Sequence, residues 1–236
     1  QSICDICVRP SCIHPTICSN LSTDHSPLIE IYRSVAAHPK VKKAFVTSGI
    51  RYDLLVAVSP RTDKINHGLE YTEQLVSEHV SGRLKVAPEH TSERVLKVMR
   101  KPSFKYFKRF KTLFEQYSDA AKLDQQLIPY FISSHPGSEL EDMAKLAGDT
   151  KELGFRLEQV QDFTPTPMTL ATVIYYSGYH PYSLKKVYTA RTKEEKQDQN
   201  RFFFWYKKEN HGWIRSTLKR LNKSRLADQL LSAGNR

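Results

Sequence analysis

The sequence predicts an α/β fold in which parallel strands alternate with helices. Four short apolar segments end in turn or polar residues, and helical spacing of apolar residues returns between them. This alternation is typical of parallel βαβ units with right-handed crossovers. No run of about 18 apolar residues occurs, so we expect no membrane-spanning helix.

The repeat begins after a polar segment. Residues 27–38 carry apolar side chains at helical spacing, with Pro27 in the first turn and Ser26 as the candidate N-cap. Residues 42–50 (KKAFVTSGI) form a short apolar run that predicts a buried strand. Residues 68–80 (GLEYTEQLVSEHV) predict an amphipathic helix.

Three more strands follow, each ended by Pro or Gly. The predicted strands cover residues 82–90, 125–137 and 155–167. The predicted helices cover residues 92–99 with Ser92 as N-cap, 106–122, and 139–154 closed by Gly154. Four strands cannot close a barrel, so they form either an open sheet or part of a larger one.

The chain divides by composition into three parts. Residues 1–26 are a cysteine-rich loop, residues 27–168 the α/β region, and residues 169–236 a basic, aromatic-rich and mainly helical extension. The net charge is +11, and residues 185–236 hold 14 Lys/Arg against 5 Asp/Glu. Such an extension can bind nucleic acid or an acidic partner, but an ordinary solvated helical face would look the same.

Five consecutive aromatic residues lie within this extension, from Phe202 to Tyr206. Aromatic side chains among Lys and Arg can stack on bases. Packing against the domain in front is the commoner role of such a run, and we expect it here.

Polar residues follow each predicted strand. Because the carboxyl ends of parallel strands form the active face of such folds, we expect a site there. Helix capping and strand-end hydrogen bonding are the alternative roles for these side chains. The candidate residues are Arg51, Asp53, Glu89, His90, His135, Gln159 and Gln161.

The four cysteines all lie in the first eighteen residues. Cys4, Cys7, Cys12 and Cys18 follow the spacing C-x2-C-x4-C-x5-C, and nothing at the start resembles a signal peptide. We therefore expect a cytoplasmic protein whose clustered thiols bind a metal rather than form disulfides. Zn²⁺ or an iron–sulfur cluster would suit them, with His14 and His25 as possible replacement ligands. Free thiols in a surface loop are the alternative.

Several segments resemble the YgiQ-type family of radical SAM proteins. They are KVAPEHTSERVLKVMRKP (85–102), LIPYFISSHPGSELEDM (127–143) and LEQVQDFTPTPMT (157–169), together with the stretch from Cys7 to Cys18 and SGIRYD (48–53). The resemblance covers essentially the whole chain. It implies a partial (β/α)6 barrel and a [4Fe-4S] cluster held by a CxxxCxxC loop, with S-adenosyl-L-methionine (SAM) as the source of a 5′-deoxyadenosyl radical.

This chain contains no CxxxCxxC motif. The resemblance therefore implies that the cluster loop and the first two strands lie upstream of Gln1, and that this chain supplies strands three to six. It would be the C-terminal part of an enzyme, with the missing N-terminal half as its partner, and we expect it to be inactive alone.

The resemblance also implies which residues contact SAM. Glu89 would accept hydrogen bonds from the amino group or ribose of SAM, and Arg94 would pair with its carboxylate. A local ion pair between the two, or a helix cap, is the alternative. Further contacts are expected at the strand ends, from His135, Gly137, Gln161, Arg51 and Asp53.

A second interpretation belongs to another functional class. The chain could be a non-catalytic zinc-binding α/β module whose basic tail contacts nucleic acid. An encoded CxxxCxxC motif within one or two βα units upstream of Gln1 would favour the enzyme.

Overall fold

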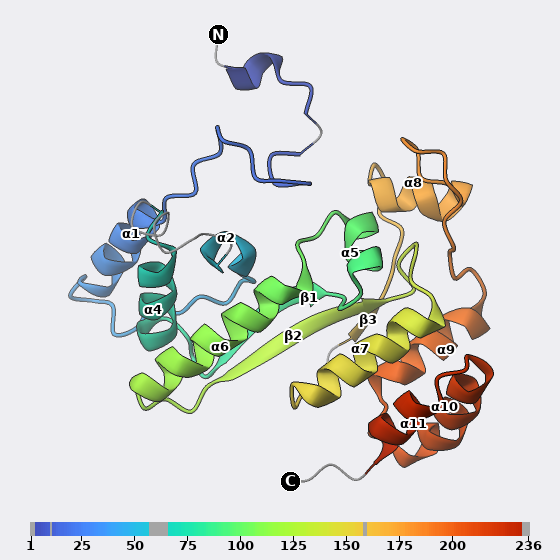
Figure 1. Ribbon diagram of the computed structural model, residues 1–236. Coiled ribbons are helices and arrows are strands. Elements are labelled where there is room, and N and C mark those ends of the chain that lie inside the picture. The colour runs from blue at the N-terminus through green and yellow to red at the C-terminus, as the bar shows by residue number, and fades with distance from the viewer. Residues whose placement is uncertain (1–2, 10, 57–65, 158–159, 233–236) are drawn as a thin grey trace. The chain divides into compact units, whose positions relative to one another are not determined.

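The computed structural model describes residues 3–9, 11–56, 66–157 and 160–232 (Figure 1). The chain forms two compact units. The first comprises residues 1–87 and 105–128, and the second comprises residues 88–104 and 129–236.

A three-stranded sheet runs in the order β1-β2-β3, formed by β1 (Arg83–Glu89), β2 (Gln126–Ser133) and β3 (Val160–Asp162). β2 and β3 are parallel, with Phe131 opposite Val160 and Ser133 opposite Asp162. The predicted α/β class is thus confirmed as a parallel sheet with helices, while the partial barrel stays a prediction.

The predicted strand at residues 42–50 is wrong. The segment has no strand assignment, and it donates one backbone hydrogen bond from Val46 to His79 O at 2.9 Å. Phe45, its largest apolar side chain, is 43% exposed. An apolar run forms a strand only if a neighbouring strand offers a ladder of hydrogen bonds. In the described residues the backbone of this run bonds instead to His79, through the Val46 N–H and through Ala44 O, which accepts from the His79 ring at 2.9 Å.

The first unit is built mainly from helices. It contains the 3-10 helix η1 (Ile3–Ile6), α1 (Ser26–Ala36), α2 (Tyr52–Val56), α4 (Gly68–Glu78) and most of α6 (Phe104–Ala120). α4 packs against both α1 and α2. Tyr52 contacts Phe107 and Phe110, with ring centroids 5.9 and 5.8 Å apart. Phe107 and Phe110 lie at helical spacing on the buried side of α6, and this spacing is what predicted the helix.

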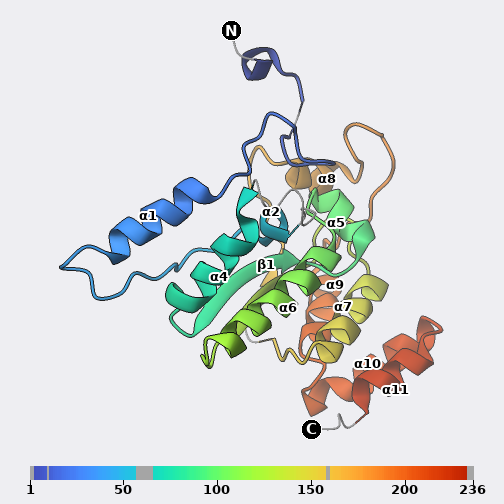
Figure 2. The same cartoon turned by 60° about the vertical axis from the view of Figure 1, so that its left-hand side comes forward.

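The second unit holds two helices of the predicted α/β region and four helices of the predicted extension among the described residues. They are α5 (Glu93–Met99), α7 (Leu140–Glu152), α8 (Leu170–Ser177), α9 (Lys193–Phe203), α10 (Lys208–Arg220) and α11 (Ser224–Leu231). α7 packs against α9 and α11, and α10 against α9 and α11; Figures 1 and 2 both show these helices together. Residues 171–182 (ATVIYYSGYHPY) form an aromatic segment without helical periodicity, yet residues 171–177 belong to the helix α8.

The aromatic run packs as expected. Phe202 and Phe203 are fully buried, and the Phe202 ring meets Trp213 at a centroid distance of 5.4 Å.

Lys151 joins α7 to the end of α11, where its ammonium donates to the carbonyl oxygens of Gln229, Leu230 and Ser232. Those carbonyls lack helical partners, so a cation at this helix end is favourable.

The turn after β2 needs an unusual backbone. Ser134 has φ +60° and Gly137 has φ +89°. A Cβ added at Gly137 would lie 3.2 Å from Val98 Cγ2. The Gly137 N–H donates to Tyr188 O at 2.7 Å. Only glycine combines this φ with so close an approach at no steric cost.

We expect Gly137→Ala to lower the free energy of unfolding by about 1–2 kcal/mol, because it forces an L-residue into the left-handed region. Urea denaturation followed by circular dichroism measures this. Gly212→Ala is the matched control: Gly212 lies in α10 with open space around it. That change should stabilise by about 0.5–1 kcal/mol. Equal effects of the two substitutions would contradict the prediction.

Candidate functional site

Glu89 ends β1 in a left-handed conformation, with φ +66°. Its side chain is 16% exposed, and the carboxylate accepts a hydrogen bond from Lys101 Nζ at 3.1 Å. A non-glycine residue in this backbone region costs energy and is concentrated at functional sites. The second unit therefore holds one partly buried carboxylate at the strand end, partnered by one cation.

His90 is fully buried, and its ring holds the two residues that precede α5. Its Nδ1 accepts hydrogen bonds from the backbone N–H of Thr91 at 2.9 Å and of Ser92 at 3.0 Å. The ring proton is consequently on Nε2, which lies 3.4 Å from Ser138 Oγ. Burial lowers the pKa of His90 to about 3, so the ring is neutral.

Arg94 joins the starts of α5 and α7. Its guanidinium donates to Glu139 Oε1 at 2.7 Å and to Asp142 Oδ2. Asp142 also accepts from Ser92 Oγ at 2.7 Å and from the Glu139 N–H at 2.9 Å. Glu89 and Arg94 do not form the local ion pair that was the alternative. Glu89 accepts from Lys101, whereas Arg94 donates to Glu139 and Asp142. Arg94 positions the corner where the two helices begin.

Gln199 of α9 satisfies the turn that follows β2. Its Oε1 accepts from Ser134 N at 2.8 Å and from Ser138 Oγ at 3.0 Å, and its Nε2 donates to Ser138 O at 2.6 Å. All three residues are fully buried. Sequence reasoning missed Gln199, although its spacing from Phe202 and Phe203 places it on the buried face of α9.

His135 and Gly137 lie in the same turn. The His135 ring donates from Nδ1 to Pro136 O at 2.8 Å and packs edge-on against Phe163 at a centroid distance of 5.0 Å. Burial lowers the pKa of His135 to about 4. Gln161 is exposed in β3, next to Asp162, which accepts from Ser133 Oγ and from Asn200 Nδ2 at 3.2 Å. The candidate residue Gln159 lies outside the described residues.

Arg51 and Asp53 pair with each other in the first unit. The guanidinium donates from Nε to Oδ1 at 2.8 Å and from Nη2 to Oδ2 at 2.6 Å. This two-bond pairing with Asp53 raises the pKa of Arg51. Glu89, Arg94, His135, Gly137 and Gln161 belong instead to the second unit.

The front cysteines do not converge. Across residues 3–9, 11–56, 66–157 and 160–232, no three His, Cys, Asp or Glu side chains form a group that could hold a metal ion. Cys4, Cys7 and Cys12 are exposed, and Cys18 is half-buried and donates its N–H to Cys12 O at 2.7 Å. The auxiliary metal site stays a prediction.

Of the helices that the structure describes, none is long and apolar enough to cross a bilayer.

We expect Gln199→Leu to reduce the free energy of unfolding by about 2–4 kcal/mol, because it removes the acceptor of the buried Ser134 N–H and the donor to the buried Ser138 carbonyl. Gln197→Leu, on the exposed side of the same helix, is the control and should change it by less than about 0.5 kcal/mol. Urea denaturation measures both. A loss at position 199 no larger than at position 197 would refute the role of the amide.

The buried, neutral His90 predicts a pH dependence of stability. Its pKa is lower in the folded state, so below about pH 6.5 the unfolded chain binds a proton that the folded chain does not. Stability is thus complete above this pH and is lost toward pH 3. Between pH 7 and pH 5 we expect His90 to account for about 2 kcal/mol of lost stability.

His90→Asn is the comparison, because its side-chain oxygen can replace Nδ1 as the acceptor at the start of α5. Urea titrations at the two pH values should show a flatter dependence for this variant. Parallel pH curves for both proteins would show that His90 does not titrate as described.

This chain is similar in sequence to part of several longer proteins. Residues 158–229 match the family described as a domain of unknown function, DUF3362. The chain is 55% identical to a UPF0313 protein of Bacteroides thetaiotaomicron, covering 100% of this chain and 38% of that protein. A UPF0313 protein of Porphyromonas gingivalis is 55% identical over 99% of this chain and 38% of its own length.

A UPF0313 protein of Methanocella arvoryzae is 38% identical over 94% of this chain and 35% of its own length. The chain therefore spans between about a third and two fifths of the curated relatives named here. The similarity covers the strand ends and the C-terminal helices alike, and it is to UPF0313 proteins that this chain is similar.

Proposed function

We propose that the carboxyl ends of β1, β2 and β3 form part of a SAM site in a radical SAM enzyme of YgiQ type. The observation that carries the proposal is Glu89, a strand-end carboxylate in a left-handed conformation that is 16% exposed and held by Lys101. It lies within the segment 85–102, whose sequence resembles that family. The chain spans 38% of the length of its Bacteroides thetaiotaomicron relative, so the activity proposed is that of the longer protein.

The residues present fit a polar nucleoside. Glu89 offers an acceptor for the amino group or ribose of SAM. Two buried hydroxyls at these strand ends, Thr91 Oγ1 and Ser134 Oγ, have no hydrogen-bond partner in the described structure. His135, Gly137 and Gln161 complete the proposed contacts, with the His135 ring held in place by Phe163. SAM, when bound, supplies the adenosyl group for radical chemistry.

The residues present do not fit the [4Fe-4S] cluster. Its three thiolate ligands would have to converge, and the described part of the chain holds no such group. We therefore derive no step through the cluster, and we propose that its ligands are in the remainder of the longer protein. The front cysteines remain candidates for an auxiliary Zn²⁺ or iron–sulfur site.

Arg94 has a supporting role in this proposal. Its guanidinium is already bound to Glu139 and Asp142, which fixes the helix that follows Glu89. A direct contact between Arg94 and the SAM carboxylate would require one of these bonds to be exchanged. Arg51 and Asp53, in the first unit, remain proposed contacts of SAM or substrate.

The zinc-module interpretation has one feature in its favour, the basic charge of residues 185–236. A nucleic-acid contact there is compatible with either function. The deciding observation is chemical: the enzyme cleaves SAM, and the module does not.

We expect Glu89→Gln to weaken SAM binding by the intact gene product about tenfold, because a charge-assisted hydrogen bond is lost. The protein is reconstituted anaerobically with iron and sulfide, and binding is measured by equilibrium dialysis. Release of 5′-deoxyadenosine on reduction is measured in parallel.

Glu152→Gln is the control, an exposed carboxylate on α7 in the same unit. It should leave binding unchanged. The proposal fails if the reconstituted wild-type protein neither binds SAM nor releases 5′-deoxyadenosine. It also fails in its assignment of Glu89 if both variants bind SAM as the wild type does.

A further inference from the structure

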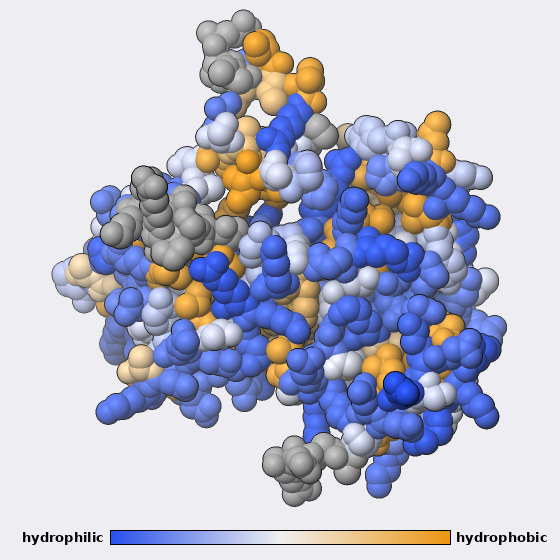
Figure 3. Space-filling model, viewed as in Figure 1, coloured by the Kyte–Doolittle hydropathy of each residue, from blue (hydrophilic) through white to orange (hydrophobic). Residues whose placement is uncertain are grey.

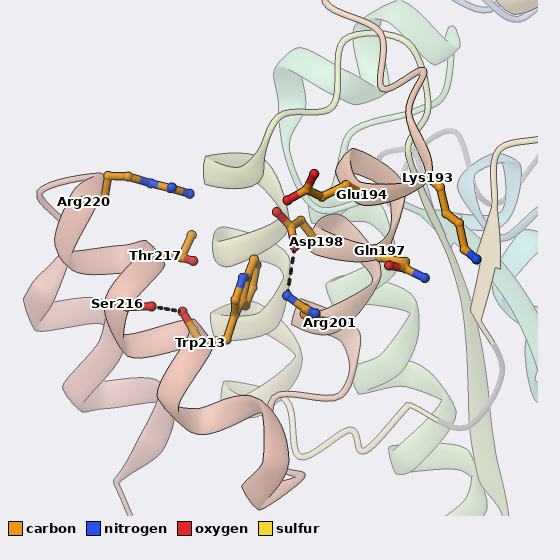
Figure 4. Close-up of a pocket in the computed structure, with 9 residues that line it drawn as sticks. All are labelled: Lys193, Glu194, Gln197, Asp198, Arg201, Trp213, Ser216, Thr217 and Arg220. Atoms are coloured by element: carbon orange, nitrogen blue, oxygen red, sulfur yellow. Dashed lines mark hydrogen bonds and ion pairs between the residues drawn. The ribbon is translucent and has the colours of Figure 1, made fainter.

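Two adjoining hollows follow α9 in the second unit. One, of 860 Å³, lies between α9 and α10, and Figure 4 shows the side chains that line it. The other, of 840 Å³, extends to Asp162 at the end of β3. Both are lined by Lys193, Gln197 and Arg201. Together they form what we call the α9 groove.

A planar cation–aromatic pair lies in the α9 groove. The Arg201 guanidinium lies over the Trp213 ring, 4.9 Å from its centroid, and donates to Asp198 Oδ1 at 3.0 Å. Phe202 supports the other partner by packing edge-on against Trp213. Both flat groups are thus held in place before any ligand arrives, and such groups stack on nucleobases.

Lys196, which lines the second hollow, lies near an aromatic ring of α8. Its Nζ is 5.5 Å from the centroid of the Tyr175 ring, which lies outside the lining of both hollows. The α9 groove thus offers cations beside the aromatic ring of Trp213. A single strand can use both, because its phosphates and bases alternate.

The α9 groove carries an excess of positive charge. Among the described residues, its lining holds five cations and three carboxylates: Arg191, Lys193, Lys196, Arg201 and Arg220 against Asp162, Glu194 and Asp198. Lys193 and Arg220 are exposed, and no ion pair or side-chain hydrogen bond within the described residues engages their head groups. Asp198, which is paired with Arg201, also attracts Arg220 electrostatically. Because the cations outnumber the carboxylates, the groove attracts anions.

The surroundings add to this attraction. The space-filling view shows a mainly hydrophilic surface over α9, α10 and α11 (Figure 3). Residues 185–236, which include these helices, carry 14 Lys/Arg against 5 Asp/Glu. Such a field raises the local concentration of a polyanion and its rate of association.

We infer that the α9 groove binds single-stranded nucleic acid, with phosphates at Lys193 and Arg220 and a base stacked at the Arg201–Trp213 pair. An acidic peptide would use the cations alone and would leave the planar pair without a role. The inference does not depend on the proposed SAM site, since binding to the groove needs no SAM.

The test is fluorescence anisotropy with the intact gene product and fluorescein-labelled oligonucleotides of about 12 nucleotides, oligo(U) and oligo(dT), in about 50 mM salt. Arg220→Ala should weaken binding about fivefold through loss of a phosphate contact. Arg225→Ala is the matched control. Arg225 is exposed on α11, outside the groove, and its replacement by Ala removes the same charge. It should weaken binding less than about twofold.

The salt dependence gives a second measurement. Replacing both Lys193 and Arg220 by Ala should reduce the slope of log K against log salt concentration by about 1.4, because each phosphate contact contributes about 0.7 on a single strand. In a Trp205→Phe background, Trp213 is the remaining tryptophan of the two in the chain. Its fluorescence should be quenched on binding.

Several results would overturn the inference. Equal losses for Arg220→Ala and Arg225→Ala would show diffuse charge attraction rather than a site. Competition by a poly-glutamate peptide at the same charge concentration would show an acidic-protein surface. Absence of binding, or binding without quenching of Trp213, would exclude the stacked base.

Discussion

The buried amide of Gln199 is the interaction on which the strand-end face depends. It satisfies a backbone N–H of Ser134 and both polar atoms of Ser138, in a turn where Ser134 has a left-handed φ of +60°. A turn of this conformation is costly and persists only when its surroundings hold it. Gln199 belongs to the region that matches DUF3362, whereas Ser134 precedes it. The C-terminal helices are therefore part of the support of the strand ends.

A second network holds the start of α5 against the start of α7. Asp142 is the centre of this network, because it accepts from Ser92 Oγ, from the Glu139 N–H and from Arg94. His90 lies between the two networks, with Nδ1 at the amides of Thr91 and Ser92, just before α5, and Nε2 near Ser138. Buried polar groups that are mutually satisfied define one arrangement, since any shift leaves one of them unpaired. The strand-end residues are in this way positioned before a ligand binds.

The sequence predicted the helices well because their apolar spacing reports burial on one side, and Pro27, Ser92 and Gly154 mark their ends. It predicted strand ends with Glu89, His90 and His135, since polar residues after an apolar run are visible locally. It failed at residues 42–50, where composition resembles a strand but no ladder forms. A short apolar run carries no information about whether a neighbour is available.

The partners of the site residues could not be predicted for a related reason. Lys101 is 12 residues from Glu89, Asp142 is 50 from Ser92, and Gln199 is 61 from Ser138. Such pairings depend on which helices meet, and the chain alone does not state this. Gln199 left one local signal, a polar residue three and four positions before Phe202 and Phe203 on the buried face of α9.

α9 carries side chains of two different surfaces. One face of the helix supports the turn after β2, and the other face lines the α9 groove. Gln199 points into the core toward the turn after β2, while Lys193, Gln197 and Arg201 line the α9 groove. A ligand that binds only the ordered helix stabilises that helix by an amount that grows with the ligand concentration. The turn after β2 depends on the same helix, since α9 carries the amide that satisfies the turn. The groove and the turn after β2 thus share one structural support.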